Sequence, residues 1–300
     1  VTGSTRGKAR ALRCADGRGA DPLWVMGSFA GSDELLACTY DTYGGVIIEP
    51  SCVPHTVEQF RQQLSSSLAQ WRKDGRAGVW LELSISDAQL IPVATAEFGF
   101  EFHSAESKHM TLKLWLPQDR PSSLPGNASH TVGVAAIVVD EAAQKLLLLR
   151  EKTGPAARLG IWKIPTGLVE AGEELHDAAV REVREETGVE AEFVDMRACR
   201  MAHVGNLAHK GKSNLLFIVR LRSKPGASAS APRADEGEIA EARWFTFEEY
   251  ESLPHPEKGT LFDVLNRSAL QAGARLVASE LSLGSKRKGK QWLYYPEPVA

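Results

Sequence analysis

The sequence predicts an α/β protein built from two domains and a linker. Apolar runs typical of strands alternate with amphipathic helical segments along most of the chain, as in α/β domains. The chain has 300 residues, enough for two domains of ordinary size. Residues 119–129 are rich in Pro, Ser, Gly and Asn, a composition typical of a linker. We therefore expect domains at 40–118 and 130–275, flanked by an irregular segment at 1–39 and a tail at 276–300.

Composition excludes several classes of protein. The formal net charge is −3, so no global basic field would recruit nucleic acid or an anionic membrane. The longest apolar run, near 132–139, is too short to span a bilayer. The cysteines are scattered and form no Cys-x-x-Cys pair, which gives a zinc site little support and suits a reducing compartment; they are Cys14, Cys38, Cys52 and Cys199.

The first segment carries four basic residues before its first acidic residue, Asp16. This bias is typical of an organelle transit peptide, and equally of a disordered or trimmed terminus. We expect a cytoplasmic protein, or a plastid or mitochondrial one if the segment is a transit peptide.

Local patterns place the elements of each domain. In the first we expect strands at 45–49, 79–83, 99–103 and 110–116, a helix at 56–72, and a short helix capped by Ser86 and ending at 97. In the second we expect strands at 131–139, 145–150, 193–203, 215–221 and 238–245, and short helices at 247–253 and 261–270. The tail combines basic residues at 286–290 with nearby aromatics; we expect it to be solvated and disordered, the alternative being contact with RNA or an import receptor.

A run of good helix formers ends at Gly188, where a C′ glycine is expected. Glu182, Glu185 and Glu186 share one face of this helix, because residues three and four apart are neighbours. Like charges so placed oppose each other by about 0.2–0.5 kcal/mol per pair. A hard divalent cation such as Mg²⁺ would turn that repulsion into a binding site; a solvated charged face is the alternative.

The spacing around these glutamates resembles the signature of the Nudix hydrolases. Glycine, five residues, glutamate, seven residues, Arg-Glu-Val, one residue, Glu-Glu, one residue and Gly-Val match that signature throughout; the positions are Gly167, Glu173, Arg181, Glu182, Val183, Glu185, Glu186, Gly188 and Val189. The resemblance implies a Nudix α/β/α sandwich with a mixed sheet over 130–275. It also implies cleavage of a diphosphate bond in a nucleoside diphosphate derivative.

The same resemblance implies roles for individual residues. The three helix glutamates would bind Mg²⁺ or Mn²⁺, together with the backbone carbonyl of Gly167. Glu173, Arg181 and Gly188 would serve the structure of the motif. The general base would lie on a late loop, where Glu236 and Glu238 are candidates. Candidates to contact substrate are Lys163, His203 and Lys212.

The first domain is similar to the one that precedes the Nudix domain in plant ADP-ribose/NADH pyrophosphatases and in the animal protein encoded antisense to basic fibroblast growth factor. The segments that carry the likeness are 71–75, 79–83, 99–106 and 115–117. The resemblance implies an acetyltransferase-like α/β domain with a structural or dimer-forming role, and so a homodimer.

The resemblance points to ADP-ribose and NADH as substrates. The NADH pyrophosphatase signature Ser-Gln-Pro-Trp-Pro-Phe-Pro is absent after the glutamates, and Asn214 replaces an acidic residue of the relatives. Two other interpretations stay open. One is a housecleaning or RNA-cap hydrolase, and the other is a regulatory binding protein that has lost turnover.

Overall fold

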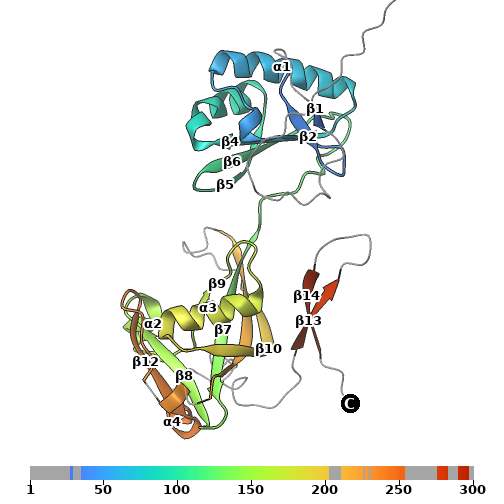
Figure 1. The fold of residues 1–300 in the computed structure, drawn as a ribbon. Coiled ribbons are helices and arrows are strands. Elements are labelled where there is room, and N and C mark those ends of the chain that lie inside the picture. The colour runs from blue at the N-terminus through green and yellow to red at the C-terminus, as the bar shows by residue number, and fades with distance from the viewer. Residues whose placement is uncertain are drawn as a thin grey trace, which may run out of the picture. The chain divides into compact units, whose positions relative to one another are not determined.

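The structure is a computed structural model of the whole chain. It describes residues 28–29, 35–202, 211–225, 227–229 and 231–253, together with the backbone of two strands at 276–282 and 290–296. The chain divides into two compact units, Val1–Asn127 and Ala128–Ala300, each with its own sheet (Figure 1).

The first unit has a six-stranded sheet in the order β1-β2-β3-β4-β6-β5. Strands β3 and β4 are parallel, and the other neighbours are antiparallel. A parallel pair needs a crossover, and α1 supplies it. The elements are β1 Ser28–Phe29, β2 Cys38–Tyr40, β3 Val46–Ile48, α1 Val57–Lys73, β4 Gly78–Ser84, β5 Glu101–Ala105 and β6 His109–Trp115, with a 3-10 turn, η1, at Pro50–Cys52.

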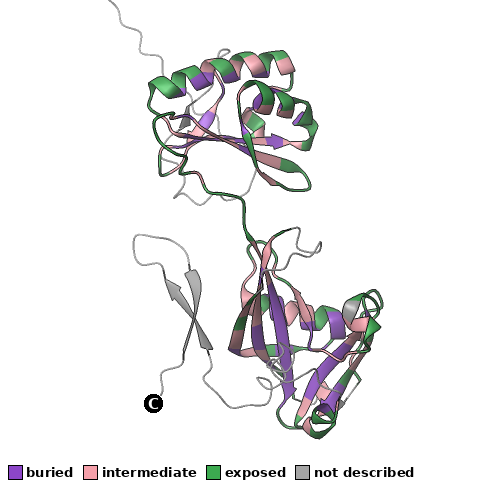
Figure 2. Cartoon of the chain, turned by 180° about the vertical axis from the view of Figure 1, so that it is seen from behind, coloured by how far each residue is buried: buried purple, intermediate pink, exposed green. Residues whose placement is uncertain are grey.

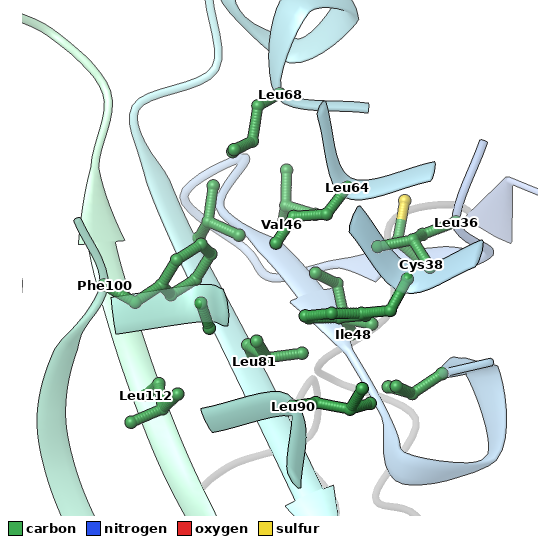
Figure 3. Close-up of a cluster of buried hydrophobic side chains, with 14 of the residues drawn as sticks. Leu36, Cys38, Val46, Ile48, Leu64, Leu68, Leu81, Leu90, Phe100 and Leu112 are labelled. Atoms are coloured by element: carbon green, nitrogen blue, oxygen red, sulfur yellow. The ribbon is translucent and has the colours of Figure 1, made fainter. Parts of the chain in front are cut away.

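Helix α1 begins and ends one residue later than predicted, because Thr56 is its N-cap. The Thr56 side chain accepts a hydrogen bond from the backbone N–H of Gln59 at 3.4 Å, as an N-cap residue does. The helix buries an apolar stripe at three- and four-residue spacing, which includes Phe60, Leu64 and Leu68. Figure 3 shows the last two directed into the core of this unit.

Two predictions for this unit are wrong. Ser86 caps no helix: it lies inside η2, a 3-10 helix at Ile85–Leu90, and a π-helix, η3, follows at Val93–Glu97. The segment before residue 40 is not wholly irregular, because β1 and β2 join the sheet and Leu36 is buried in the core. Leu36 lies in the short apolar run 35–38, which is too brief to show the period of a strand or a helix.

The predicted linker packs partly on the first unit. Trp115 donates its indole N–H to the carbonyl oxygen of Arg120 at 3.1 Å, and Lys113 Nζ donates to that of Pro125 at 3.0 Å. Leu124 lies where a side chain on Gly78 would be, since a Cβ there would come within 2.7 Å of it.

The second unit has a mixed sheet in the order β12-β8-β7-β11-β10-β13-β14, with β9 paired to β7. Strands β7 and β11 run parallel, and the other pairs are antiparallel. The elements are β7 His130–Asp140, β8 Lys145–Glu151, α2 Gly154–Arg158, β9 Thr166–Leu168, α3 Leu175–Thr187, β10 Ala191–Ala202, β11 Ser213–Ser223, η5 Ala227–Ala229, β12 Ile239–Thr246 and α4 Phe247–Glu251.

Hydrophobic clusters lie on both faces of this sheet. On one face, Ala179 and Val183 of α3 pack with Val134 and Val219. On the other, Tyr250 of α4 packs with Ile137 and neighbouring strand residues. Buried residues therefore fill the central strands (purple in Figure 2). The predicted α/β sandwich with a mixed sheet is confirmed.

The tail prediction is wrong for two segments. Strands β13, Leu276–Ser282, and β14, Lys290–Pro296, form an antiparallel pair, and Leu276 pairs with Met196 of β10. The predicted helix at 261–270 lies outside the described residues. No helix in the described part of the chain is long and apolar enough to cross a membrane.

Candidate active site

Helix α3 presents the predicted glutamates. It spans Leu175–Thr187, and Gly188 ends it in the left-handed conformation (φ 67°) with its N–H donating to the Arg184 carbonyl at 2.9 Å. Glycine adopts this conformation without strain. The buried side of the helix holds Val183 against the sheet, so the adjoining face must carry its charged residues next to β9.

Gly167 lies against the carboxylate of Glu182. A Cβ at position 167 would come within 1.8 Å of Glu182 Cδ and 2.0 Å of Oε1. The Glu182 side chain is 16% exposed, and burial is the largest influence raising the pKa of its carboxyl group. The motif glycine therefore provides space that the carboxylate occupies.

Glu186 is the most deeply buried of the three helix glutamates. It accepts a hydrogen bond from the Thr166 backbone N–H at 3.2 Å. Burial raises the pKa of Glu186 to about 8, Lys163 nearby lowers it and Glu182 raises it further. A buried carboxyl group with so high a pKa, next to a second one, is typical of a functional site.

Arg181 connects the helix to the preceding loop. Its Nε and Nη2 donate to the two oxygens of Glu173 at 2.7 and 2.9 Å, and Nη2 also donates to the Leu168 carbonyl at 3.0 Å. Its Nη1 reaches Glu182 and Glu185 at 2.9 and 3.0 Å. The guanidinium lowers the pKa of Glu173. This geometry suits the predicted bracing role.

We expect Arg181→Lys to weaken the fold of the second unit. An ammonium group cannot reproduce the two-pronged contact with Glu173, and losing charge-assisted hydrogen bonds of this kind costs about 1–3 kcal/mol. Urea unfolding measures the change. Arg222→Lys is the matched control, since Arg222 is 53% exposed and meets Glu192 at 3.4 Å. Equal stability of the two variants would contradict the bracing role.

Stability of the metal-free chain should fall as pH rises from about 4.5 to about 8. In this window folded Glu186, with a pKa of about 8, holds a proton that the unfolded chain, with a value near 4.5, has released. Folding therefore takes up protons, and the slope attributable to Glu186 approaches at most about 1.4 kcal/mol per pH unit. Denaturation in the presence of chelator, measured at several pH values for the wild type and for Glu186→Gln, isolates the contribution of Glu186. If the two plots of unfolding free energy against pH were parallel, that contribution would be refuted.

The loop before β12 closes the site from the other side. Asp235 donates its backbone N–H to the Glu186 carbonyl at 3.0 Å, and its Oδ2 accepts the N–H groups of Gly237 and Glu238, both at 2.9 Å. The Glu238 carbonyl accepts the Lys152 backbone N–H at 2.8 Å. The loop is thus attached both to the end of α3 and to the end of β8.

These elements form a cleft of about 480 Å³. Its lining combines carboxylates from the helix and the late loop with the backbone of β9; the residues are Thr166, Gly167, Leu168, Glu182, Glu185, Glu186, Asp235 and Glu238. Five predicted site residues therefore come together: Gly167, Glu182, Glu185, Glu186 and Glu238. Thr166, Leu168 and Asp235 also line the cleft and were not among the residues predicted for the site.

Other predicted residues lie elsewhere. The described residues that line the cleft do not include Glu236, whose carbonyl accepts from Lys152 Nζ. Lys163 is not among the described residues that line the cleft and is paired with Glu151 and Thr166. Lys212 is half-buried just before β11 and does not line the cleft. His203 is outside the described residues.

The donors in the cleft suit a hard cation, because they are carboxylate and backbone oxygens. In the conformation described, no group of three or more His, Cys, Asp or Glu side chains in the described residues is close enough to hold a metal ion. Arg181 explains part of this, since it binds Glu182 and Glu185. Glu185 is 54% exposed. Each of these contacts uses one oxygen of the carboxylate, Oε1 of Glu182 and Oε2 of Glu185.

Asn214 is buried in the sheet. It accepts from Arg200 Nη2 at 2.7 Å and donates to Thr131 Oγ1 at 3.1 Å. These bonds tie β11 to β10 and β7. The amide thus has a structural place in this chain.

A helix of carboxylates, braced by a motif arginine and packed against a motif glycine at the wall of a cleft, defines a Nudix-type domain. A family model described as "NUDIX domain" matches residues 129–265, and one described as "Nudix hydrolase domain" matches residues 36–116. The chain belongs to the Nudix hydrolase family, whose members are pyrophosphohydrolases of nucleoside diphosphate derivatives.

Curated proteins similar to this chain carry Nudix names as well. Nudix hydrolase 8 of Arabidopsis thaliana is 40% identical, covering 77% of this chain and 60% of that protein. Nudix hydrolase 2 of the same plant is 41% identical, covering 73% and 75%. Human nucleoside diphosphate-linked moiety X motif 6 is 44% identical, covering 54% and 50%. The chain thus spans from half to three quarters of these proteins. A solved MutT NUDIX hydrolase from Burkholderia pseudomallei also matches, at 23% identity over 46% of this chain and 97% of its own, with a TM-score of 0.36.

The predicted family, fold class and enzyme class are confirmed by these findings. The acetyltransferase-like shape of the first domain stays a prediction, as do the roles of individual site residues.

Proposed function

We propose that the chain hydrolyses the diphosphate bond of nucleoside-diphosphate-linked compounds with Mg²⁺, or Mn²⁺ in its place. ADP-ribose and NADH are the leading substrates, and the products are AMP and the phosphorylated remainder. The observation that carries the proposal is the pair Glu182 and Glu186: two sheltered carboxyl groups with raised pKa values, side by side in a cleft. Such crowding is unfavourable for folding alone and is relieved by a cation.

When bound, the metal would neutralise charge on the diphosphate and lower the pKa of water. Glu182, Glu185 and Glu186, with the Gly167 carbonyl, are the groups that would hold it. The ionised Glu186 carboxylate would accept a hydrogen bond from the Thr166 N–H through one oxygen, which leaves its second oxygen for a ligand. Arg181 holds the loop that carries Glu173 against the helix while the cleft residues act.

We assign Glu238 as the group that removes a proton from the attacking water. It is exposed, lines the cleft and lies on a loop attached at both ends. Asp235 is less available for this work, because one of its oxygens already accepts two backbone N–H groups.

We expect Glu238→Gln to lower kcat by about 10²–10⁴-fold, the usual contribution of a positioned acid or base. Glu236→Gln, measured in parallel, decides between the two glutamates, and we expect it to change kcat little, since Glu236 lies outside the cleft. Steady-state assays of AMP release at saturating substrate measure both. A large loss in Glu236→Gln with none in Glu238→Gln would reverse the assignment.

A substrate panel tests the proposal itself. AMP release is measured from ADP-ribose, NADH, coenzyme A and capped RNA, with Mg²⁺ and with chelator. We expect turnover of ADP-ribose or NADH that chelator abolishes. Turnover of capped RNA alone would favour the cap-hydrolase interpretation, and no hydrolysis at all would favour a regulatory binding protein. We also propose a homodimer through the first domain, which light scattering of the purified chain tests.

A further inference from the structure

A chain of polar contacts centred on Lys163 adjoins the cleft through Thr166. This residue forms an isolated bridge with Leu149 of β8, with backbone hydrogen bonds of 2.9 and 2.8 Å in the two directions. Its Nζ donates to Thr166 Oγ1 at 2.8 Å and forms an ion pair with Glu151 at the end of β8. The Lys163 side chain is 14% exposed and is absent from the described lining of the cleft.

Thr166 receives contacts from both sides. Its hydroxyl oxygen accepts a hydrogen bond from Lys163 Nζ, and its backbone N–H donates one to the Glu186 carboxylate at 3.2 Å. It also immediately precedes Gly167, whose position opposite Glu182 leaves no room for a Cβ. A shift of Thr166 would therefore displace the anchor of one carboxylate and the wall facing the other.

From these contacts we infer that Lys163 is a positioning residue, which fixes Thr166 and through it the carboxylates of Glu186 and Glu182. This inference rests on the proposed function and replaces the predicted contact of Lys163 with substrate. Glu151 has a part in it, because a sheltered ammonium group needs a partner, and that partner sets the direction in which the Lys163 side chain extends.

Effects of this kind are measurable. Groups that orient metal ligands through hydrogen bonds contribute about 10–100-fold to metal affinity or activity. A positioning residue should therefore change metal affinity and kcat, whereas a substrate contact should change KM. Loss of fold alone would lower the unfolding temperature, and it would not change metal affinity and kcat in proportion to each other.

The experiment uses the full chain with two matched sets of variants. Thr166→Val removes the hydroxyl while keeping the shape and the backbone N–H, and Thr166→Ser keeps the hydroxyl. Lys163→Met removes the ammonium group, and Lys163→Arg keeps the charge. Lys145→Met, at the opposite end of β8, is the control. Readouts are Mn²⁺ affinity by paramagnetic resonance without substrate, kcat, KM and thermal unfolding.

We expect Lys163→Met and Thr166→Val each to weaken Mn²⁺ binding and lower kcat by about 10–100-fold, with KM within twofold. Thr166→Ser and Lys163→Arg should recover most of the loss, and Lys145→Met should match the wild type. A rise in KM at unchanged kcat, unchanged Mn²⁺ affinity in both variants, or losses that only follow unfolding would overturn the inference. A wild type that neither binds Mn²⁺ nor turns over substrate would overturn the proposed function, and the inference with it.

Discussion

Glu182→Gln and Glu186→Gln should each abolish turnover of the wild-type substrate while leaving the fold intact. Each replacement keeps shape and hydrogen-bonding capacity, so Glu186→Gln can still accept the Thr166 N–H. What it loses is a negative charge in a cleft that must attract a cation. Groups that merely orient metal ligands contribute about 10–100-fold, so loss of a ligand itself should exceed about 100-fold in kcat.

The measurement pairs steady-state kinetics with circular dichroism and thermal unfolding. Glu192→Gln on β10 is the control, because Glu192 is 62% exposed and forms an ion pair with Arg222 on the neighbouring strand. Removing the sheltered acid at position 186 should leave stability equal or higher above about pH 8, where the wild-type group is charged. Near-normal turnover in both cleft variants would remove the proposed metal site.

Gly167→Ala should reduce turnover nearly as much as Glu182→Gln or Glu186→Gln, although it adds only a methyl group. The added Cβ would meet Glu182 Cδ at 1.8 Å, a separation that no pair of atoms tolerates without bonding. Either the Glu182 carboxylate or β9 must move, and misplacement of a reacting group by about 1 Å can reduce rate 10²-fold. Overpacking of this kind also costs about 1–3 kcal/mol of stability.

Gly126→Ala is the matched substitution, since a Cβ there meets nothing within 4 Å. We expect it to preserve both kcat and the urea midpoint, while Gly167→Ala lowers both and raises the Mn²⁺ dissociation constant. If Gly167→Ala bound Mn²⁺ and turned over substrate as the wild type does, then the contact between Gly167 and Glu182 would have no functional weight.

Local pattern was sufficient for much of the architecture. The helix at 56–72, the strands that were predicted in each sheet and the end of α3 at Gly188 follow from period, capping and backbone conformation, which depend on near neighbours. The shared helical face of Glu182, Glu185 and Glu186 follows from helix geometry in the same way. The spacing of the motif residues was specific enough to identify the family.

Tertiary structure decided which polar residues reach the cleft. Lys163 was a candidate to contact substrate and Glu236 a candidate base, yet neither is among the described residues that line the cleft. Thr166 and Asp235 enter it because β9 pairs with β7 and because the late loop is bound to the end of α3. Such placement depends on contacts between segments dozens of residues apart, which no local period encodes.

By itself, then, the sequence determined the family and the row of acids along α3, which depend on residues within a few turns of one another, and the two-domain α/β plan, which follows from chain length and a linker composition. The pKa of about 8 at Glu186, the space at Gly167 and the contacts of Lys163 were decided by folding alone. The physical reason is that burial and close approach are properties of surfaces brought together, and they arise only when α3, β9 and β8 meet.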